Sequence, residues 1–371
     1  MRGPRFPWGR AVTERAHTVD LMGLSPDELA VFLSGLGQPA YRARQLFSWL
    51  HRGAAFEEMT DLPKQLRHRL AAFASAGTLE IQQRESAPDA TTKLAFRAGD
   101  GEIVETVLIP HRDRTTVCVS SQIGCAYGCQ FCATGQQGLT RSLSEGEIVH
   151  QVVQAQREIA PRRISNVVFM GMGEPLANYD AVTKAVRLLN LPGGLNIGAR
   201  HIALSTCGLP GQIKRLAGER LPVALAISLH GATDQVRSQL VPINRKHPIA
   251  EIMTAAREFA ERTGRKVTFE YMIVPGLNDT GEQARRLAAL VRGFPAMVNL
   301  LPRNPIQSSA QPDAGAVAHF AGILEKLGVP VAVRRSRGAE VLGACGQLRG
   351  RLGDKQPSRG TDTRPAKHRS P

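Results

Sequence analysis

Short apolar runs alternate with amphipathic stretches along the chain from residue 115 onward. The apolar runs predict buried strands: TVCVSS, NVVFMG, HIALST, VALAISLH, KVTFEYMIV, MVNLLP and VPVAVRR. Helical spacing between them predicts helices at about 144–159, 178–190, 210–218, 233–240, 248–263, 280–293 and 314–327. Repeated strand–helix units predict an α/β fold with a parallel sheet, and this many units favour a complete or partial (β/α) barrel.

The C-terminal ends of the predicted strands are unusually polar or rich in glycine. They carry Cys118, the GMGEP run, Ser205, the SLH run, Glu270 and Asn304. Because the chemistry of such barrels lies at the C-terminal ends of the strands, we expect a functional site on this rim.

Residues 20–75 form a separate helical pattern that precedes the barrel. In SPDELAVFLSGLG, Ser25 is a predicted N-cap, Glu28 follows three residues later as in a capping box, and Gly35 lies near the end. AYRARQLFSWLHRG continues with helical spacing, so the sequence predicts a small helical module. Its basic side chains either contact phosphates or form an ordinary solvated face: Arg42, Arg44, His51, Arg52, Lys64, Arg67 and Arg69.

A predicted β-hairpin links the module to the barrel, with TTKLAFRA and EIVETVLIP on either side of the turn GDGE. Alternation in the second strand places Glu105 on one face with Ile103, Val107 and Ile109. An unpaired carboxylate facing an apolar layer has a raised pKa, which suits a general acid or base. The alternatives are a buried ion pair and a strand whose opposite face is buried, and the strand pattern alone favours these over a general acid or base.

The composition predicts the compartment of the protein and a class of partner. With 371 residues and 42% hydrophobic content, the chain is long enough to bury a large core. No run of about eighteen apolar residues could span a bilayer, and MRGPRFPWGRAV lacks the apolar core of a signal peptide, so we expect a soluble cytoplasmic protein with no membrane association. The net charge of +15 indicates a polyanionic partner such as nucleic acid, although ordinary solubility charge is the alternative.

Three of the six cysteines lie together in CAYGCQFC, as Cys125, Cys129 and Cys132. Six cysteines are too few for a disulfide framework in a chain of this length, and clustered thiols in a reducing compartment more often bind metal or do chemistry. A structural zinc site needs four ligands, and neither His150 nor Cys207 is an obvious fourth. A 4Fe–4S cluster held by three thiolates instead keeps one iron open for a small molecule.

The CxxxCxxC loop after the first strand of a partial barrel resembles the radical S-adenosylmethionine (SAM) superfamily. CVSSQIGCAYGCQFCATGQQG, NVVFMGMGEPLAN, ALAISLHGATDQVRSQLVPIN, NLLPRNP and ACGQL together resemble the RlmN/Cfr family of RNA adenine methyltransferases, and most closely its RlmN branch, over residues 20–349. The resemblance implies a partial (β/α) TIM-type radical SAM barrel, one 4Fe–4S cluster on the three clustered cysteines, and SAM contacts at Gly173, Glu174, Ser205, Ser228, Leu229, His230 and Asn304.

The resemblance also implies roles for three residues outside the cluster. One SAM methylates Cys345, and the 5′-deoxyadenosyl radical from a second SAM removes hydrogen from that methyl group, so that the methylene radical adds to the adenine. Glu105 matches the acceptor of the adenine proton, which favours the general-base interpretation of this residue. Cys118 matches the resolving thiol, which releases the RNA and leaves a transient disulfide with Cys345 for a reductant to reopen.

The implied activity is methylation of carbon 2 of an adenine in 23S ribosomal RNA and of an adenine beside the anticodon in some transfer RNAs. The resemblance further implies an electron donor of the flavodoxin type and a monomeric protein. Carbon-8 methylation of the same ribosomal adenine uses the same cysteines, so the motifs leave it open, although the N-terminal module favours carbon 2. A non-catalytic RNA-binding protein with a zinc knuckle is the alternative from another class.

These patterns divide the chain into four predicted segments: a flexible basic N-terminus (1–19), a helical RNA-binding accessory module (20–90), the barrel with its C-terminal catalytic loop (91–349) and a basic tail (350–371). The tail is rich in proline, glycine and charge. Because it can bury almost no apolar surface to offset the entropy of ordering, we expect it to be disordered.

Overall fold

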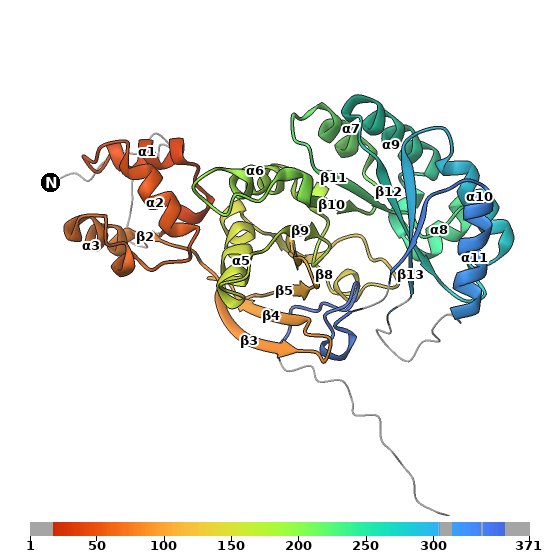
Figure 1. Cartoon of the computed structure of the whole chain (residues 1–371), viewed down its shortest axis with the longest axis horizontal. Helices are drawn as coiled ribbons and strands as arrows, with labels where there is room; N and C mark the ends of the chain where they lie inside the picture. Colours follow the sequence, from red (N-terminus) through yellow and green to blue (C-terminus); the bar gives the residue numbers. More distant parts are fainter. Residues whose placement is uncertain (1–17, 303, 305–313, 335–336, 353–371) are drawn as a thin grey trace, which may run out of the picture.

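The computed structural model describes residues 18–302, 304, 314–334 and 337–352. Figure 1 shows a helical module beside a curved sheet that is covered by helices on its outer side. Most of the two predicted flexible ends lies outside the described residues. In the described part of the chain, no helix has the length and apolar character needed to cross a membrane.

A ten-stranded sheet runs through the molecule in the order β14-β13-β12-β11-β10-β9-β6-β5-β4-β3. Its parallel part contains every apolar run that the sequence predicted as a strand: β6 (Thr115–Cys118), β9 (Asn166–Phe169), β10 (Ile202–Thr206), β11 (Ala224–Ser228), β12 (Val267–Ile273), β13 (Ala296–Pro302) and β14 (Val331–Val333). Each strand pairs in parallel with its neighbours from β6 through β14. The α/β partial barrel is therefore confirmed.

The predicted helices are present between these strands, each within two residues of its predicted bounds: α5 (Glu145–Glu158), α6 (Tyr179–Asn190), α7 (Pro210–Gly218), α8 (Asp234–Leu240), α9 (Ile249–Thr263), α10 (Gly281–Val291) and α11 (Ala314–Lys326). A capping box starts α5, in which the Glu147 amide donates to Ser144 Oγ at 3.1 Å and the Ser144 amide donates to the Glu147 carboxylate at 2.8 Å. Buried apolar faces of these helices pack on the sheet.

Three antiparallel strands extend the sheet beyond β6: β3 (Glu80–Ser86), β4 (Thr92–Arg97) and β5 (Ile103–Pro110). The predicted hairpin is β4–β5, and it continues the barrel sheet. The sequence analysis missed β3, because EIQQRES has a single strongly apolar residue. It also missed a separate antiparallel ribbon of β7 (Gln122–Cys125) and β8 (Gly138–Ser142), which closes the base of the CxxxCxxC loop.

The N-terminal module contains α1 (Pro26–Ser34), α2 (Arg42–Leu50) and α3 (Lys64–Phe73), with the short parallel pair β1 (Val19–Asp20) and β2 (Ala74–Ser75). The predicted capping box of α1 is present at Ser25 and Glu28. Lys184 of α6 connects the module to the barrel, because its Nζ contacts Glu28 at 2.8 Å and Glu145 at 3.0 Å.

Candidate active site

The three cysteines of the CxxxCxxC spacing lie on one loop between β7 and β8. Cys125 ends β7, Cys129 lies within the loop, and Cys132 immediately precedes the short helix α4 (Ala133–Gln136). Gly124 has a φ of +75°, and a Cβ at this position would collide with the backbone of β8. A glycine is therefore needed for the ribbon to close beneath the loop.

The chemistry of this loop fits an iron–sulfur cluster. Burial raises the pKa of Cys125 to about 11 and raises the pKa values of Cys129 and Cys132 as well, so the bare thiols stay protonated at neutral pH. A bound metal centre supplies the positive charge that deprotonates such thiols. Among the described residues, no three metal-binding side chains converge where a single ion would sit. A cluster has several irons, so its three thiolates need not converge on one ion.

The C-terminal segment that contains Cys345 packs directly on the cysteine loop. The Ala133 amide donates to the Gly346 carbonyl at 2.7 Å, and Thr134 Oγ1 donates to the Leu348 carbonyl at 2.7 Å. A Cβ at Gly346, whose φ is +82°, would lie 2.7 Å from the Phe131 carbonyl oxygen. These contacts bring together two segments more than two hundred residues apart in the chain.

Cys118 and Cys345 are neighbours at this rim. Cys118 ends β6 and is buried, whereas Cys345 is an exposed residue whose thiol is surrounded by protein atoms. Burial raises the pKa of Cys118 to about 12, with the nearby Cys345 thiol adding to the rise. The pKa of Cys345 is also raised, because protein atoms desolvate its thiol, while the Arg334 guanidinium opposes the rise. Both thiols are free.

Glu105 lies in the buried ion pair that the strand pattern left open. Its carboxylate is 2% exposed, and Oε1 is 3.2 Å from Lys93 Nζ, which also contacts Glu85 at 2.9 Å. The other oxygen, Oε2, accepts the backbone N–H groups of Arg349 at 2.6 Å and Gly350 at 2.8 Å. Glu105 is thus joined to the segment that carries Cys345, and both of its oxygens have partners.

Gly173 and Glu174 lie where the GMGEP run leaves β9. A Cβ at Gly173, whose φ is +94°, would collide with Gln122 of the ribbon. Glu174 is 3% exposed, and its carboxylate accepts the amides of Leu176 at 2.9 Å and Cys207 at 2.7 Å. Burial raises the pKa of this carboxyl. The GMGEP turn therefore carries a buried, firmly held carboxyl group near the cysteine loop.

The remaining predicted SAM contacts lie on the same rim: Ser205, Ser228, Leu229, His230 and Asn304. Burial lowers the pKa of His230 to about 3, so its imidazole is neutral, and Nδ1 accepts the Met272 amide at 3.0 Å. Its ring meets Phe131 of the cysteine loop edge-on, with 4.6 Å between centroids. The Asn304 amide donates to the Cys345 carbonyl at 3.0 Å. His230 and Asn304 therefore support the two loops of the site.

Arg237 on α8 is a buried charge that the sequence analysis did not single out. Its guanidinium donates to the carbonyl of Cys207, to the carbonyl of Ser228 at 3.4 Å and to Asn244 Oδ1 at 2.8 Å. These bonds connect the ends of β10 and β11 beneath the rim. Its place in the SLHGATDQVRSQLVPIN block was the available signal, but the polar helix around it suggests a surface residue.

Glu270 is a third buried carboxyl of the site. The sequence analysis placed it at a strand end, whereas it lies in the middle of β12, level with Ser228 at the end of β11. It is 4% exposed, and Oε1 accepts Asn299 Nδ2 at 3.1 Å, with Arg334 at 4.0 Å. Oε2 is buried and has no hydrogen-bond partner within the described part of the structure. Burial raises the pKa of Glu270, and this carboxyl in turn contributes to the raised pKa of Cys345.

Comparisons with known proteins agree with this geometry. A model of the radical SAM superfamily matches residues 119–288, and a model of the ribosomal RNA large subunit methyltransferase N-terminal domain matches residues 19–76. A solved structure of a radical SAM methyltransferase from Sphaerobacter thermophilus superposes with a TM-score of 0.88 at 46% identity, covering 90% of this chain and all of that one. The fold and the three-cysteine loop thus define a radical SAM protein.

Curated relatives narrow the class. A dual-specificity RNA methyltransferase RlmN from Anaeromyxobacter dehalogenans is 47% identical over 353 residues, which cover 92% of this chain and 95% of that protein. Another from Geobacter sulfurreducens is 46% identical over 344 residues, covering 92% and 94%. The chain belongs to the RlmN family of radical SAM enzymes, and a 4Fe–4S cluster and SAM are the cofactors of that superfamily.

Proposed function

We propose that this protein methylates carbon 2 of an adenine in 23S ribosomal RNA and of an adenine beside the anticodon in some transfer RNAs. The observation that carries the proposal is the packing of the Cys345 segment on the CxxxCxxC loop, with Cys118 beside Cys345. Two further thiols at a cluster-binding loop fit a reaction in which the protein carries the methyl carbon. The relatives named as dual-specificity RNA methyltransferases support the two RNA substrates.

The cofactors would be held by the residues of the rim. Cys125, Cys129 and Cys132 would bind the cluster, and SAM would contact Gly173, Glu174, Ser205, Ser228, Leu229, His230 and Asn304. When bound, the cluster and SAM supply the electron and the carbon-centred radical. We propose two SAM molecules per methylation, one that methylates Cys345 and one that provides the radical.

We propose that Cys345 carries the methyl carbon and that Cys118 releases it. Cys345 is an exposed residue that would meet both the cofactor and the base, whereas Cys118 is buried. With a pKa of about 12, Cys118 is protonated at neutral pH, so its attack on the sulfur of Cys345 requires loss of that proton. Attack by the Cys118 thiolate on the Cys345 sulfur would form the disulfide and break the bond from that sulfur to the methylene carbon, which takes up a proton and becomes the methyl group of the released RNA. The one electron left over would pass to the bound cluster, and a reductant would then reopen the disulfide.

Glu105 is the proposed acceptor of the adenine proton. One oxygen of the Glu105 carboxylate contacts Lys93, and the other is bound by the amides of Arg349 and Gly350. We propose that the segment after Cys345 moves away from Glu105 as the RNA is bound. Proton transfer would then be coupled to the position of the catalytic cysteine.

The same proposal extends to the electron donor, the oligomeric state and the compartment. The cluster needs a one-electron donor, for which we propose a protein of the flavodoxin type. We also propose that the enzyme acts as a monomer in the cytoplasm, where its RNA substrates and reductants occur.

The test is anaerobic turnover with SAM and a reductant on ribosomal and transfer RNA, followed by nucleoside mass spectrometry against 2-methyladenosine and 8-methyladenosine. We expect about four irons and four sulfides per chain, as one 4Fe–4S cluster requires, and 2-methyladenosine in both RNAs. Formation of 8-methyladenosine would contradict the carbon-2 assignment. Protein that contains zinc but no iron after anaerobic purification would overturn the catalytic proposal altogether.

A further inference from the structure

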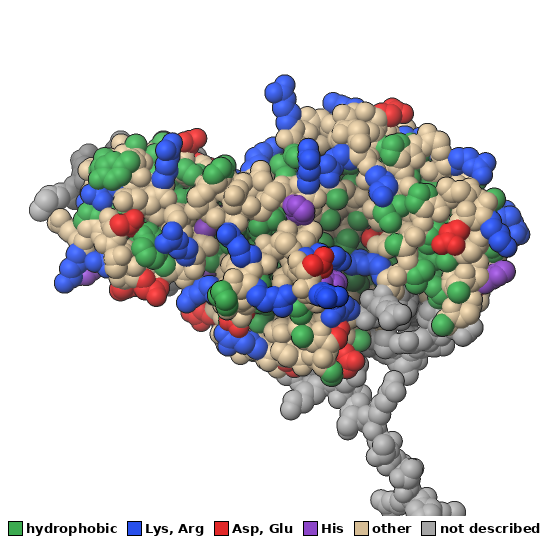
Figure 2. All heavy atoms as spheres, viewed as in Figure 1, with side chains coloured by type: hydrophobic (Ala, Val, Ile, Leu, Met, Phe, Trp, Pro, Cys, Tyr) green, Lys and Arg blue, Asp and Glu red, His purple; other side chains and the backbone are tan. Residues whose placement is uncertain are grey.

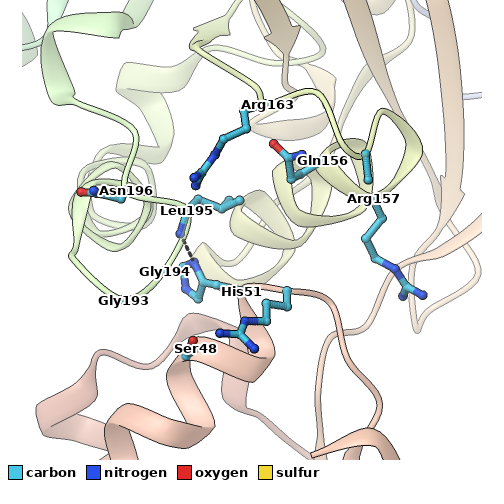
Figure 3. Close-up of a pocket in the computed structure, with 11 residues that line it drawn as sticks. Ser48, His51, Gln156, Arg157, Arg163, Gly193, Gly194, Leu195 and Asn196 are labelled. Atoms are coloured by element: carbon cyan, nitrogen blue, oxygen red, sulfur yellow. Dashed lines mark hydrogen bonds between the residues drawn. The ribbon is translucent and has the colours of Figure 1, made fainter.

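A pocket lies where the N-terminal module meets the barrel, away from the cysteine loop (Figure 3). It has a volume of about 570 Å³ and is formed by three separate parts of the chain. These are the end of α2 with the residues after it, the end of α5 with the loop that follows, and residues 193–196 after α6. The close approach depends on Gly194, where a Cβ would lie 2.7 Å from His51 Nδ1.

The charge of this pocket is positive. Its lining includes Arg52, Arg157 and Arg163 and no aspartate or glutamate. All three arginines are exposed, and none forms an ion pair with another described residue. Figure 3 shows Arg163 extending toward the residue 193–196 loop, whereas Arg157 extends away from it. Because a guanidinium keeps its charge at any physiological pH, the pocket stays cationic.

The uncharged groups of the pocket are also suited to an anion. Burial lowers the pKa of His51 to about 4, so the ring is neutral at pH 7. Its Nδ1 accepts the Leu195 amide at 3.4 Å, which leaves the ring hydrogen on Nε2. That Nε2 is buried and has no hydrogen-bond partner among the described residues. Ser48 adds a hydroxyl to the lining of the pocket beside its positive charge.

The position of the pocket points to a polymeric anion. Lys and Arg side chains occur on both the module and the barrel on the face shown in Figure 2. Helix α5 connects the site to the pocket, because it begins just after β8 and its C-terminal end forms one wall. Fourteen helical residues span about 21 Å. A phosphate in the pocket and a base at the cysteine loop would therefore belong to different parts of one folded RNA.

We propose that this pocket binds a backbone phosphate of the RNA substrate, with Arg52 and Arg163 as its principal contacts. The proposal rests on the proposed function in taking RNA as the substrate. It adds a second point of contact, made jointly by the module and the barrel, which positions the RNA without touching the reacting base.

The test compares RNA binding by the full-length, cluster-loaded enzyme with that of the double variant Arg52→Gln/Arg163→Gln. Binding of a ribosomal RNA fragment and of a transfer RNA is measured by filter binding at several KCl concentrations. Each lost phosphate contact makes the plot of log K against log salt less steep by about 0.7 to 0.9, and because both arginines are proposed to contact one phosphate, we expect a change of about 0.7 to 0.9. We also expect the affinity at about 0.1 M salt to fall roughly tenfold.

The matched control is Arg285→Gln/Arg292→Gln, which removes the same charge from exposed positions on and just after α10. In Figure 1, α10 lies at the end of the barrel opposite the module. We expect this control to bind RNA within twofold of the original protein. If both double variants lose affinity equally, the effect is one of net charge and the pocket is not a phosphate site. If the first double variant unfolds, the single change Arg163→Gln provides the same comparison.

Phosphate-ethylation interference identifies the contact directly. A phosphate whose ethylation weakens binding by the original enzyme but not by Arg52→Gln/Arg163→Gln is the one in the pocket. Absence of any such phosphate, or equal RNA affinities, would overturn the proposal. If the double variant no longer binds inorganic phosphate but binds RNA as well as the original protein does, the pocket is a site for a small anion, and the proposal is also overturned.

A separate readout keeps this inference distinct from the proposed function. Methylation of Cys345 and SAM cleavage are measured without RNA in both double variants, and we expect them to be unchanged. If the original enzyme methylates RNA and the double variant binds it equally well, only the pocket proposal fails. If the original enzyme does not methylate RNA at all, the proposed function fails first.

Discussion

Charged side chains at the active-site rim differ in burial and in bonding partners from those in the pocket between the module and the barrel. At the rim, Glu105 and Arg237 are buried, and each is held by several hydrogen bonds or ion pairs. In the pocket, Arg52 and Arg163 are exposed and have no acidic partner among the residues that the structure describes. The rim holds its polar groups in place for chemistry, whereas the pocket leaves its charges available for a ligand.

The difference also concerns protonation. Burial raises the pKa of Cys118 to about 12 and raises the pKa values of Glu174 and Glu270, so the rim favours uncharged forms when no cofactor is present. The arginines of the pocket keep their charge. Substitutions at the rim should therefore change the reaction, and substitutions in the pocket should change RNA affinity.

The largest effect is expected from Cys345→Ala, which removes the proposed carrier of the methyl group. We predict no methylated Cys345 peptide and at least a thousandfold loss of RNA methylation, because no other described thiol is both exposed and outside the cluster loop. Mass spectrometry of the protein and of RNA nucleosides measures both. The control Cys207→Ala keeps the backbone amide that contacts Glu174 and should retain activity. Normal turnover by Cys345→Ala would remove the residue from the mechanism.

Cys118→Ala should stop the reaction one step later. We predict that Cys345 is still methylated and that protein covalently bound to RNA accumulates, because the thiol that would attack the Cys345 sulfur is missing. A denaturing gel with labelled RNA detects the adduct directly. Release of free methylated RNA at the normal rate would show that another group resolves the adduct.

Glu105→Gln tests the buried ion pair and the proposed base together. Lys93 would keep only Glu85 as a partner, so we expect the free energy of unfolding to fall by about 3 kcal/mol, the cost of leaving a buried charge poorly paired. We also expect release of RNA after radical addition to slow by about a hundredfold, since a general base is lost. Chemical denaturation and single-turnover kinetics measure the two effects.

The control for this substitution is Glu85→Gln, which removes the other partner of Lys93 but lies outside the rim. It should cost less stability, because the Glu85 side chain is 20% exposed, against 2% for Glu105. Its RNA release should be unchanged. Weakened SAM binding by Glu105→Gln, with intact release of RNA, would contradict the assigned role.

The sequence predicted the barrel well because strand and helix periodicity is local information. Each predicted element from residue 115 onward is present, and so are the capping boxes at Ser25 and Ser144. Strand β3 was missed because its residues alternate between exposed and half-buried positions without a clear apolar face. Its place in the sheet depends on the partner strand β4 and not on its own composition.

Contacts between distant segments could not be predicted from the residues alone. Lys93 reaches Glu105 across the β4–β5 pair, so their contact depends on strand register. The resemblance to a known family named Cys118 and Cys345, but not the hydrogen bonds that hold the Cys345 segment on the cysteine loop. The pocket between the module and the barrel forms only where three parts of the chain meet. Nothing in the local sequence around His51 or Arg163 indicates that these parts come together.

The smallest effect on the reaction is expected from His51→Phe, at the wall of the pocket between the module and the barrel. The His51 pKa is about 4 in the folded protein, against about 6.5 in an unfolded chain, so only the unfolded state takes up this proton as the pH falls between these values. Stability from His51 is therefore fully present above pH 6.5 and is lost as the pH falls toward 4, by about 1.4 kcal/mol per pH unit. Phenylalanine keeps the ring contact with Phe47 but does not titrate, so the variant should lose stability less steeply in this range.

Urea unfolding from pH 7 to pH 4.5 measures the slope of stability against pH, and His68→Gln, at an exposed position of α3, should leave it unchanged. Equal slopes for His51→Phe and the original protein would mean that His51 has the same pKa in the folded and unfolded states, so that its ring becomes charged below about pH 6.5, where we infer a neutral ring.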